Sequence, residues 1–198
     1  MYISFLGDEL QRSMEMAKDN TEQKKQVTIE ELKQILKTER PTPWEDIPDI
    51  DLYMDQILSY MLRQHIGLDF GETLTSAMIN NYMKKDVLPR AKGKRYERTH
   101  IAYLTAICLL KQVLSVDSTK DMLYAHLGEA GSGNEASIKA FYEKYCDKLS
   151  ETYDEVSEKL EDDMSKNDIM ELALELAISS YAQKLVCERL LDIAKEKM

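Results

Sequence analysis

The chain has 198 residues, enough for one domain, or for a small domain with an appendage, to bury its own core. Its hydrophobic content of 43%, with only 7 Gly and 4 Pro, favours a mostly α-helical protein over a β-rich one, because turns are scarce and good helix formers are abundant. The net charge is −10, so the chain is acidic overall and a basic segment within it is unusual.

Cysteine usage and the start of the chain further narrow the class of protein and its compartment. The three cysteines, Cys108, Cys146 and Cys187, are odd in number and widely spaced, which excludes a disulfide framework and the paired thiols of structural zinc sites. The chain begins without a cationic leader, and it has no run of 18 apolar residues. We therefore expect a cytoplasmic protein that does not span a membrane.

Residues 1–44 are expected to form an N-terminal helical arm and a proline-rich linker. The first 40 residues suggest one or two amphipathic helices, and Thr28 and Glu31 have the spacing of a capping box at the start of the second. Three prolines between residues 41 and 48 then bracket Trp44. Because proline lacks the donor that a helix interior needs, this segment must run extended or turned.

Residues 45–128 are expected to form the central domain. Its first helix is predicted to begin at Asp49 and Asp51, whose carboxylates suit the positive end of a helix dipole. The later helices are predicted at residues 75–85, at residues 98–114 as the apolar core element, and from a Ser118 cap to Gly128. Residues 90–96 are too short and too charged for a helix, and a glycine at position 93 between lysines suits the tip of a hairpin.

Residues 129–198 are expected to form a C-terminal helical hairpin. Two long helices are predicted, at residues 135–164 and 167–197, with Asn167 or Asp168 as the cap of the second. Such a pair can pack on its own domain or on a second copy of the chain, and both arrangements remain open at this point. A homodimer formed through this hairpin is our hypothesis.

The most informative feature is a basic segment. Residues 84–98 contain seven basic and two acidic side chains, in a chain that is acidic on both sides of them. Concentrated Lys and Arg create a local positive potential, whose commonest use is to attract a polyanion such as nucleic acid. A solvated charged loop is the simpler alternative.

The order of helix, short helix, basic hairpin and helix across residues 49–115 is that of a winged helix-turn-helix. In that fold the second helix enters the DNA major groove and the hairpin lies against phosphates. Inward contacts of the second helix are expected from Ala77, Met78, Ile79 and Tyr82. The predicted DNA-binding residues are Thr75, Ser76, Asn80, Asn81, Tyr82, Lys84, Lys85, Lys92, Lys94, Arg95 and Arg98.

Four stretches of the chain carry a resemblance to a known family. They are Pro48-Asp-Ile-Asp-Leu-Tyr-Met-Asp55, Met78-Ile-Asn-Asn-Tyr-Met-Lys-Lys-Asp-Val-Leu-Pro89, Gly93-Lys-Arg-Tyr96 and Leu110-Lys-Gln-Val-Leu114. Together they resemble the bacterial domain-of-unknown-function family 1836, over roughly residues 45–128. This resemblance implies a fold and no particular activity.

A more distant resemblance points to the DNA-binding domain of MerR-type regulators. Tyr82, Leu88, Pro89, Arg95 and Tyr96 match positions of that family's recognition helix, turn and wing. The resemblance implies that Tyr82 and Arg95 lie at the DNA backbone. The chain departs from the family in having Asn where those regulators usually have Arg at position 80, and Asp where they have Gly at position 86.

No other constellation predicts catalysis or a cofactor. Asp154, Glu158 and Asp162 repeat on one helix face, which indicates a solvated face more readily than a cation site. The three histidines, at positions 65, 100 and 126, have no partners at catalytic or metal-ligand spacing, and no Walker-type loop or nucleophile elbow occurs. We therefore predict a protein that is not an enzyme and that has neither metal nor cofactor.

These observations predict a transcriptional regulator that binds double-stranded DNA as a homodimer and does not bind a membrane. An unidentified small effector between the C-terminal helices is compatible with the sequence. The alternative is a non-enzymatic protein–protein interaction module, in which the helix-turn-helix surface docks onto an acidic protein partner. The net charge of −10 favours this alternative, because an acidic body repels DNA at long range.

Overall fold

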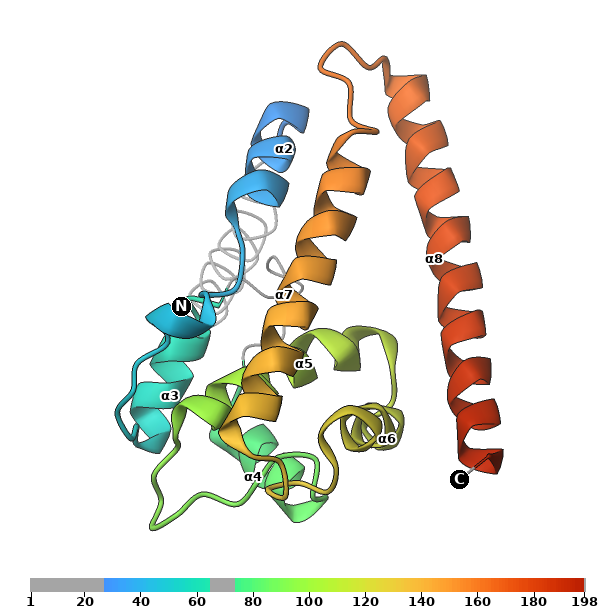
Figure 1. The fold of residues 1–198 in the computed structure, drawn as a ribbon. Coiled ribbons are helices and arrows are strands. Elements are labelled where there is room, and N and C mark those ends of the chain that lie inside the picture. Colours follow the sequence, from blue (N-terminus) through green and yellow to red (C-terminus); the bar gives the residue numbers. More distant parts are fainter. Residues whose placement is uncertain (1–26, 65–73, 198) are drawn as a thin grey trace, which may run out of the picture.

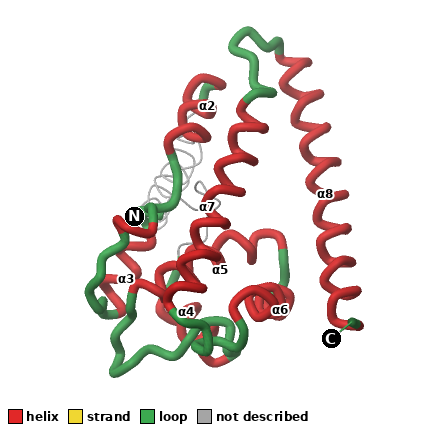
Figure 2. Tube along the Cα trace, viewed as in Figure 1, coloured by secondary structure: helices red, strands yellow, loops and turns green. Residues whose placement is uncertain are grey.

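The computed structural model describes residues 27–64 and 74–197. Within these ranges the chain forms helices and no strand, as the composition predicts (Figures 1 and 2). In chain order they are α2 (Ile29–Thr38), the 3-10 helix η1 (Trp44–Asp46), α3 (Met54–Met61), α4 (Ser76–Lys84), α5 (Arg98–Val113), α6 (Val116–Leu127), α7 (Glu135–Ser157) and α8 (Lys166–Glu196). None of these helices combines the length and the apolar character that a membrane span requires.

Helix α5 lies at the centre of the core. Every residue from 100 to 107 is buried, so this helix is covered on all sides over two turns. Helices α3, α6 and α7 pack against it (Figure 1). The prediction that residues 98–114 are the core element is confirmed, and Ile101, Leu104 and Ile107 are among its fully buried side chains.

The N-terminal segment packs along α7. The predicted capping box is present at the start of α2: the Thr28 amide donates to Glu31 Oε2 at 2.9 Å, and the Glu31 amide donates to Thr28 Oγ1 at 3.1 Å. The linker buries Trp44 in η1. The predicted helix before Thr28 falls in residues 1–26 and lies outside the described residues, as does His65.

Helix α3 begins later than predicted. Asp49 and Asp51 precede the helix, which starts at Met54. The reason is an antiparallel bridge: the Leu52 amide donates to the Tyr96 carbonyl at 2.9 Å, and the Tyr96 amide donates to the Leu52 carbonyl at 2.8 Å. Because these bonds require extended backbone at Leu52, no helix can pass through that residue.

The predicted caps of α6 and α8 are wrong by two or three residues. Ser115 caps α6 by accepting the Ser118 amide at 3.0 Å, so Ser118 lies inside the first turn. Ser165 caps α8, where it accepts the Asp168 amide at 3.3 Å and donates its own amide to the Asp168 carboxylate at 3.0 Å. In both helices the N-cap serine accepts a hydrogen bond from the amide of a residue that the sequence predicts as the cap.

Helix α8 lies at the side of the molecule, with its C-terminal end beside α6 (Figure 1). It is joined there by the ion pair of Lys195 with Asp121 at 2.6 Å, and near the α7–α8 turn by Lys159 with Glu175 at 2.6 Å. Helix α7 ends at Ser157, well before the predicted residue 164. None of the described residues of α8 is buried.

Candidate nucleic-acid interface

Helix α4 has one buried face and one exposed polar face. Thr75 caps the helix by accepting the Met78 amide at 3.2 Å. Ile79 and Tyr82 are buried against the core. Two asparagines and two lysines, Asn80, Asn81, Lys84 and Lys85, are exposed together with Thr75 and Ser76. The helix therefore exposes side-chain amides and ammonium groups to solvent, while Ile79 and Tyr82 hold it against the core.

Ala77 differs from the sequence interpretation, and Tyr82 agrees with one of its two expectations. Ala77 was expected to point inward and is exposed, because it shares a helix face with Asn80, Asn81 and Lys84 at spacings of three, four and seven. Tyr82 is only 2% exposed, which confirms that it points inward; its side chain therefore packs in the core and is not part of the exposed face.

The chain leaves α4 through a left-handed turn at Asp86. This residue has φ of +56°, the Val87 amide donates to the Tyr82 carbonyl at 2.9 Å, and the Asp86 amide donates to the Met83 carbonyl at 3.2 Å. These two bonds form a Schellman motif, which favours glycine at the left-handed position. The Tyr124 hydroxyl donates to the Asp86 carbonyl at 3.0 Å and ties this turn to α6.

The segment after this turn forms a tight hairpin. Lys92 and Arg95 make an antiparallel bridge, and the Arg95 amide donates to the Lys92 carbonyl at 3.0 Å. Gly93 and Lys94 have φ of +59° and +65°, and two positive values are those of a type I′ turn. The bridge of Tyr96 to Leu52 anchors the base of this hairpin to the segment before α3. These bonds anchor the base of the hairpin, while the lysines near its tip remain exposed.

Several cations of this surface have carboxylate partners. Lys92 binds Glu97 at 2.9 Å, and this hydrogen bond raises the pKa of the lysine. Arg95 lies 3.7 Å from an Asp51 carboxylate oxygen. Lys85 lies at the same distance from Asp117. These pairs are exposed to solvent, so each is weak and can exchange its carboxylate for another anion.

Other cations differ in their surroundings. The Arg98 guanidinium lies over the Trp44 ring, 5.6 Å from its centroid, and is partly buried. In the part of the chain that the structure describes, Lys84 and Lys94 form no ion pair. Figure 1 shows α4 and the green segment that follows it at the end of the molecule opposite the α7–α8 turn. Among the described residues of α4 and the hairpin, Lys84 and Lys94 are thus cations without a carboxylate partner.

The structure adds two neighbours of the hairpin that were not among the predicted site residues. Asp51 pairs with Arg95, and the Arg95 guanidinium carbon is 6.0 Å from the centroid of the Tyr53 ring. The sequence carries no clear signal for them, because the residue types from Ile50 to Met54 do not alternate between polar and apolar as in a half-buried strand.

Comparison with known proteins places the chain in a family. The family model described as Domain of unknown function (DUF1836) matches residues 42–145, which is more than half of the chain. The chain belongs to the DUF1836 family. No curated protein and no solved structure matches the chain significantly.

The DUF1836 match begins before η1 and ends inside α7. It therefore includes Ile138 and Tyr142, two side chains of α7 that are buried in the same core as α3, α4 and α5. The core that contains residues of α3, α4 and α5 thus extends into α7. Residues 146–198, including all of α8, lie outside the match.

His100 lies buried beneath the hairpin of the DUF1836 domain. Its Nδ1 accepts the Glu97 amide at 3.0 Å, and its ring meets Tyr96 edge to face with centroids 5.5 Å apart. Because Nδ1 accepts, the neutral ring carries its proton on Nε2. Burial lowers the pKa of His100 and keeps it neutral near pH 7. The spacing of Glu97 and His100, that of a capping box, is the signal by which the sequence could have indicated this role.

The three acidic residues considered as a cation site do not converge. Asp154 binds Arg40 at 3.1 Å, and Asp162 binds Lys33 at 2.8 Å, so both tie the α7 region to α2. Over residues 27–64 and 74–197 no group of three His, Cys, Asp or Glu side chains is placed to hold a metal ion.

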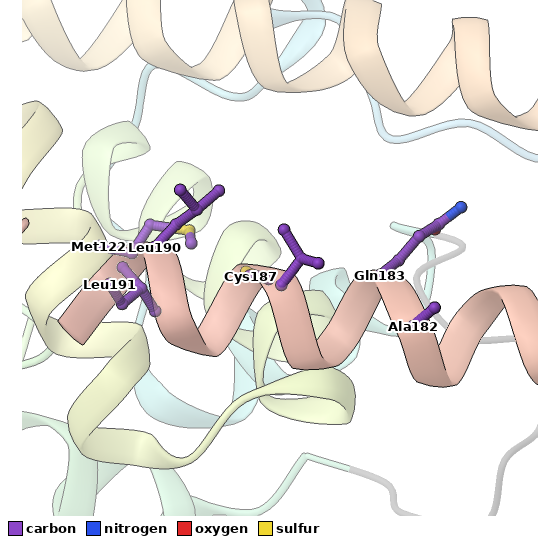
Figure 3. Close-up of a pocket in the computed structure, with 7 residues that line it drawn as sticks. Met122, Ala182, Gln183, Cys187, Leu190 and Leu191 are labelled. Atoms are coloured by element: carbon purple, nitrogen blue, oxygen red, sulfur yellow. The ribbon is translucent and has the colours of Figure 1, made fainter. Parts of the chain in front are cut away.

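An apolar groove of about 540 Å³ lies between α6 and the C-terminal half of α8 (Figure 3). Its lining residues are Met122, Ala182, Gln183, Val186, Cys187, Leu190 and Leu191. The sequence is compatible with a small effector between the two C-terminal helices, α7 and α8, and the groove described here is formed instead by α6 and α8. Gln183 is its one polar lining side chain, so the groove offers few groups that could orient a polar ligand.

Proposed function

We propose that this protein binds double-stranded DNA and regulates transcription, with α4 in the major groove and the 90–96 hairpin against phosphates. The observation that carries the proposal is the juxtaposition of an exposed Asn and Lys face on α4 with an anchored hairpin whose tip holds the unpaired Lys94. Catalysis plays no part in it.

The dimensions and chemistry of α4 suit this role. A helix with its side chains is about 10–12 Å across, and the major groove of B-DNA is about 12 Å wide. Asn80 and Asn81 are exposed and can make paired hydrogen bonds to adenine. Lys84, one turn further on, can reach a base edge or a phosphate. Buried Tyr82 is left out of the contacts that we propose, and its role is to hold the helix.

The topology supports the same interpretation. Helices α3 and α4 are followed by a hairpin and then by α5, and the hairpin pairs with the segment before α3. This is the order of a winged helix-turn-helix, to which the distant MerR-type resemblance also points. The left-handed backbone at Asp86 allows the turn that those regulators make with glycine.

Fluorescence anisotropy with random duplex DNA across a salt series tests the proposal. Replacing Lys94 and Arg95 by Ala should weaken binding to all sequences and reduce the slope of log K against log salt by about one unit per lost phosphate contact. The matched control is Lys144→Ala with Lys166→Ala, two exposed lysines of α7 and α8, which should leave the slope unchanged.

A slope that is the same in the hairpin variant and in the wild type would overturn the assignment of the hairpin to phosphates. Replacing Asn80 by Ala should act differently, because it should reduce discrimination between sequences and leave the salt slope intact.

Two observations favour the second candidate, a protein-interaction module. The net charge of −10 opposes approach to DNA, and Ile50 and Tyr53 are exposed beside the hairpin, where they can bury apolar surface against a protein. No binding to DNA even at low salt would favour this candidate. Pull-down with the wild type and with a Tyr53→Ser variant would then test whether this apolar surface captures a partner.

A further inference from the structure

Helix α8 has an exposed apolar stripe over residues 170–185. The stripe consists of Met170, Leu174, Ile178, Tyr181 and Leu185, which are between 43% and 70% exposed. Their spacings of four, four, three and four keep them on one face of the helix. That face is opposite the one that bears Cys187 and Leu191, which line the groove with α6.

This exposure is large for a surface that nothing covers. Side chains of this size have areas of about 200 Å², so the five together expose roughly 600 Å², near the upper end of the largest apolar patch on a typical monomer. Ile169, Val186, Leu190 and Ile193 are also exposed on α8, but they lie on its other side, where Val186 and Leu190 line the groove with α6, so they add nothing to the stripe. Two copies of the stripe facing each other would together bury about 1,200 Å², the lower end of the range for a specific interface. Because most helical stability in proteins comes from packing of an apolar face, covering this stripe would stabilise α8.

We propose that a second copy of this chain covers the stripe, with the two α8 helices antiparallel. The stripe is nearly symmetric about Ile178: Leu174 and Tyr181 lie four and three residues from it, and Met170 and Leu185 lie eight and seven. In an antiparallel pair Ile178 therefore meets its own copy, and the other four side chains meet one another across the interface.

The charges beside the stripe favour the same orientation. The N-terminal half of α8 holds Asp168, Glu171 and Glu175 with Lys166, and the C-terminal half holds Lys184, Arg189 and Lys195 with Glu188, Asp192 and Glu196. A parallel pair would place the two net-acidic halves side by side, and like charges repel. An antiparallel pair instead places the net-acidic half of one helix beside the half of the other helix in which the charges balance.

The association has a consequence for recognition that rests on the proposed function. Two copies related by a two-fold axis carry two α4 helices and two hairpins, so their DNA target would consist of two inverted half-sites. Self-association itself depends only on α8 and can be tested without DNA.

Sedimentation equilibrium of the full chain is the first test. The wild type should be a dimer at micromolar concentration, and Ile178→Glu should be a monomer, because it buries two carboxylates against each other. Ser180→Glu adds the same charge two residues away and off the stripe, and it should remain a dimer. Circular dichroism verifies that both variants keep their helices. A monomeric wild type, as expected if residues 1–26 cover the stripe, would overturn the proposal, and so would a dimeric Ile178→Glu.

Disulfide cross-linking tests the orientation in a Cys187→Ser background. Burial raises the pKa of Cys108 and of Cys146 to about 11, so these thiols stay protonated and react slowly. Ile178→Cys should cross-link to itself, and Leu174→Cys should cross-link to Tyr181→Cys when the two variants are mixed. Self-cross-linking of Leu174→Cys in preference to the mixed pair would show parallel helices and overturn the antiparallel arrangement. Loss of DNA binding with dimerisation intact would instead count against the proposed function.

Discussion

At the scale of the residue, His100 makes the hairpin region sensitive to pH. Its buried ring accepts a backbone hydrogen bond at Nδ1, which a proton on that atom would abolish. Burial lowers the pKa of His100 in the folded protein below its ordinary value of 6.5. Between these two values the unfolded chain binds more protons than the folded chain, so the free energy of unfolding falls as the pH falls below about 6.5.

We expect urea denaturation between pH 7.5 and pH 5.5 to show this loss, with a slope of at most about 1.4 kcal/mol per pH unit for one proton. His100→Gln should remove that part of the slope, because glutamine keeps an acceptor for the Glu97 amide and does not titrate. His126→Gln, at an exposed histidine of α6, is the matched control and should retain the full slope. Equal slopes in the two variants would contradict the role assigned to His100.

At the scale of the element, the end of α4 is strained at one residue. Asp86 adopts φ of +56°, a conformation that is unfavourable for a residue with a Cβ atom. Its ion pair with Arg90, at 4.0 Å and exposed, compensates little. Asp86→Gly should therefore raise the free energy of unfolding by roughly 0.5–1 kcal/mol, since glycine suits this position of a Schellman motif.

Asp86→Ala is the matched control, because it removes the same carboxylate and keeps a Cβ atom. It should be less stable than Asp86→Gly by about 1 kcal/mol in urea denaturation. Indistinguishable stabilities of the two variants would show that the backbone is not held in the left-handed region.

The sequence predicted elements well where apolar periodicity was strong, and less well where a tertiary hydrogen bond or a cap decided the boundary. The core helix α5 and the capping box of α2 were both predictable, because each depends on residues close in sequence. The start of α3 was not predictable from the dipole argument, since the backbone at Leu52 is fixed by pairing with Tyr96, 44 residues away. For α6 and α8, the N-cap is a serine three residues before Ser118 and Asp168, respectively.

For the candidate site too, local sequence predicted some features, and tertiary contacts decided others. Exposure of Asn80, Asn81 and Lys84 could be predicted, because the 3.6-residue period places them together once Ile79 is assigned to the core. The carboxylate partners of Arg95 and Lys85 could not be predicted, since Asp51 and Asp117 approach these cations only in the tertiary structure. The burial of Tyr82 follows from the helix period. Its assignment to the DNA backbone came from the MerR-type resemblance alone.

At the scale of the whole molecule, stability is distributed unevenly between the DUF1836 domain and α8. The domain has a continuous core around α5, whereas the described part of α8 contains no buried residue. Local opening of a helix requires little free energy when few apolar contacts hold it. In a single copy α8 should therefore exchange its amide hydrogens far faster than α5.

Hydrogen exchange measured by mass spectrometry checks this distribution. In the wild type at high protein concentration, amides of residues 170–185 should be protected by the second copy, and dilution below the dissociation constant should remove the protection. In Ile178→Glu these amides should exchange rapidly at every concentration, while α5 remains as protected as in the wild type. Ser180→Glu should behave as the wild type does. Protection of α8 that is independent of concentration, and equal in all three proteins, would mean that the stripe is covered from within one chain.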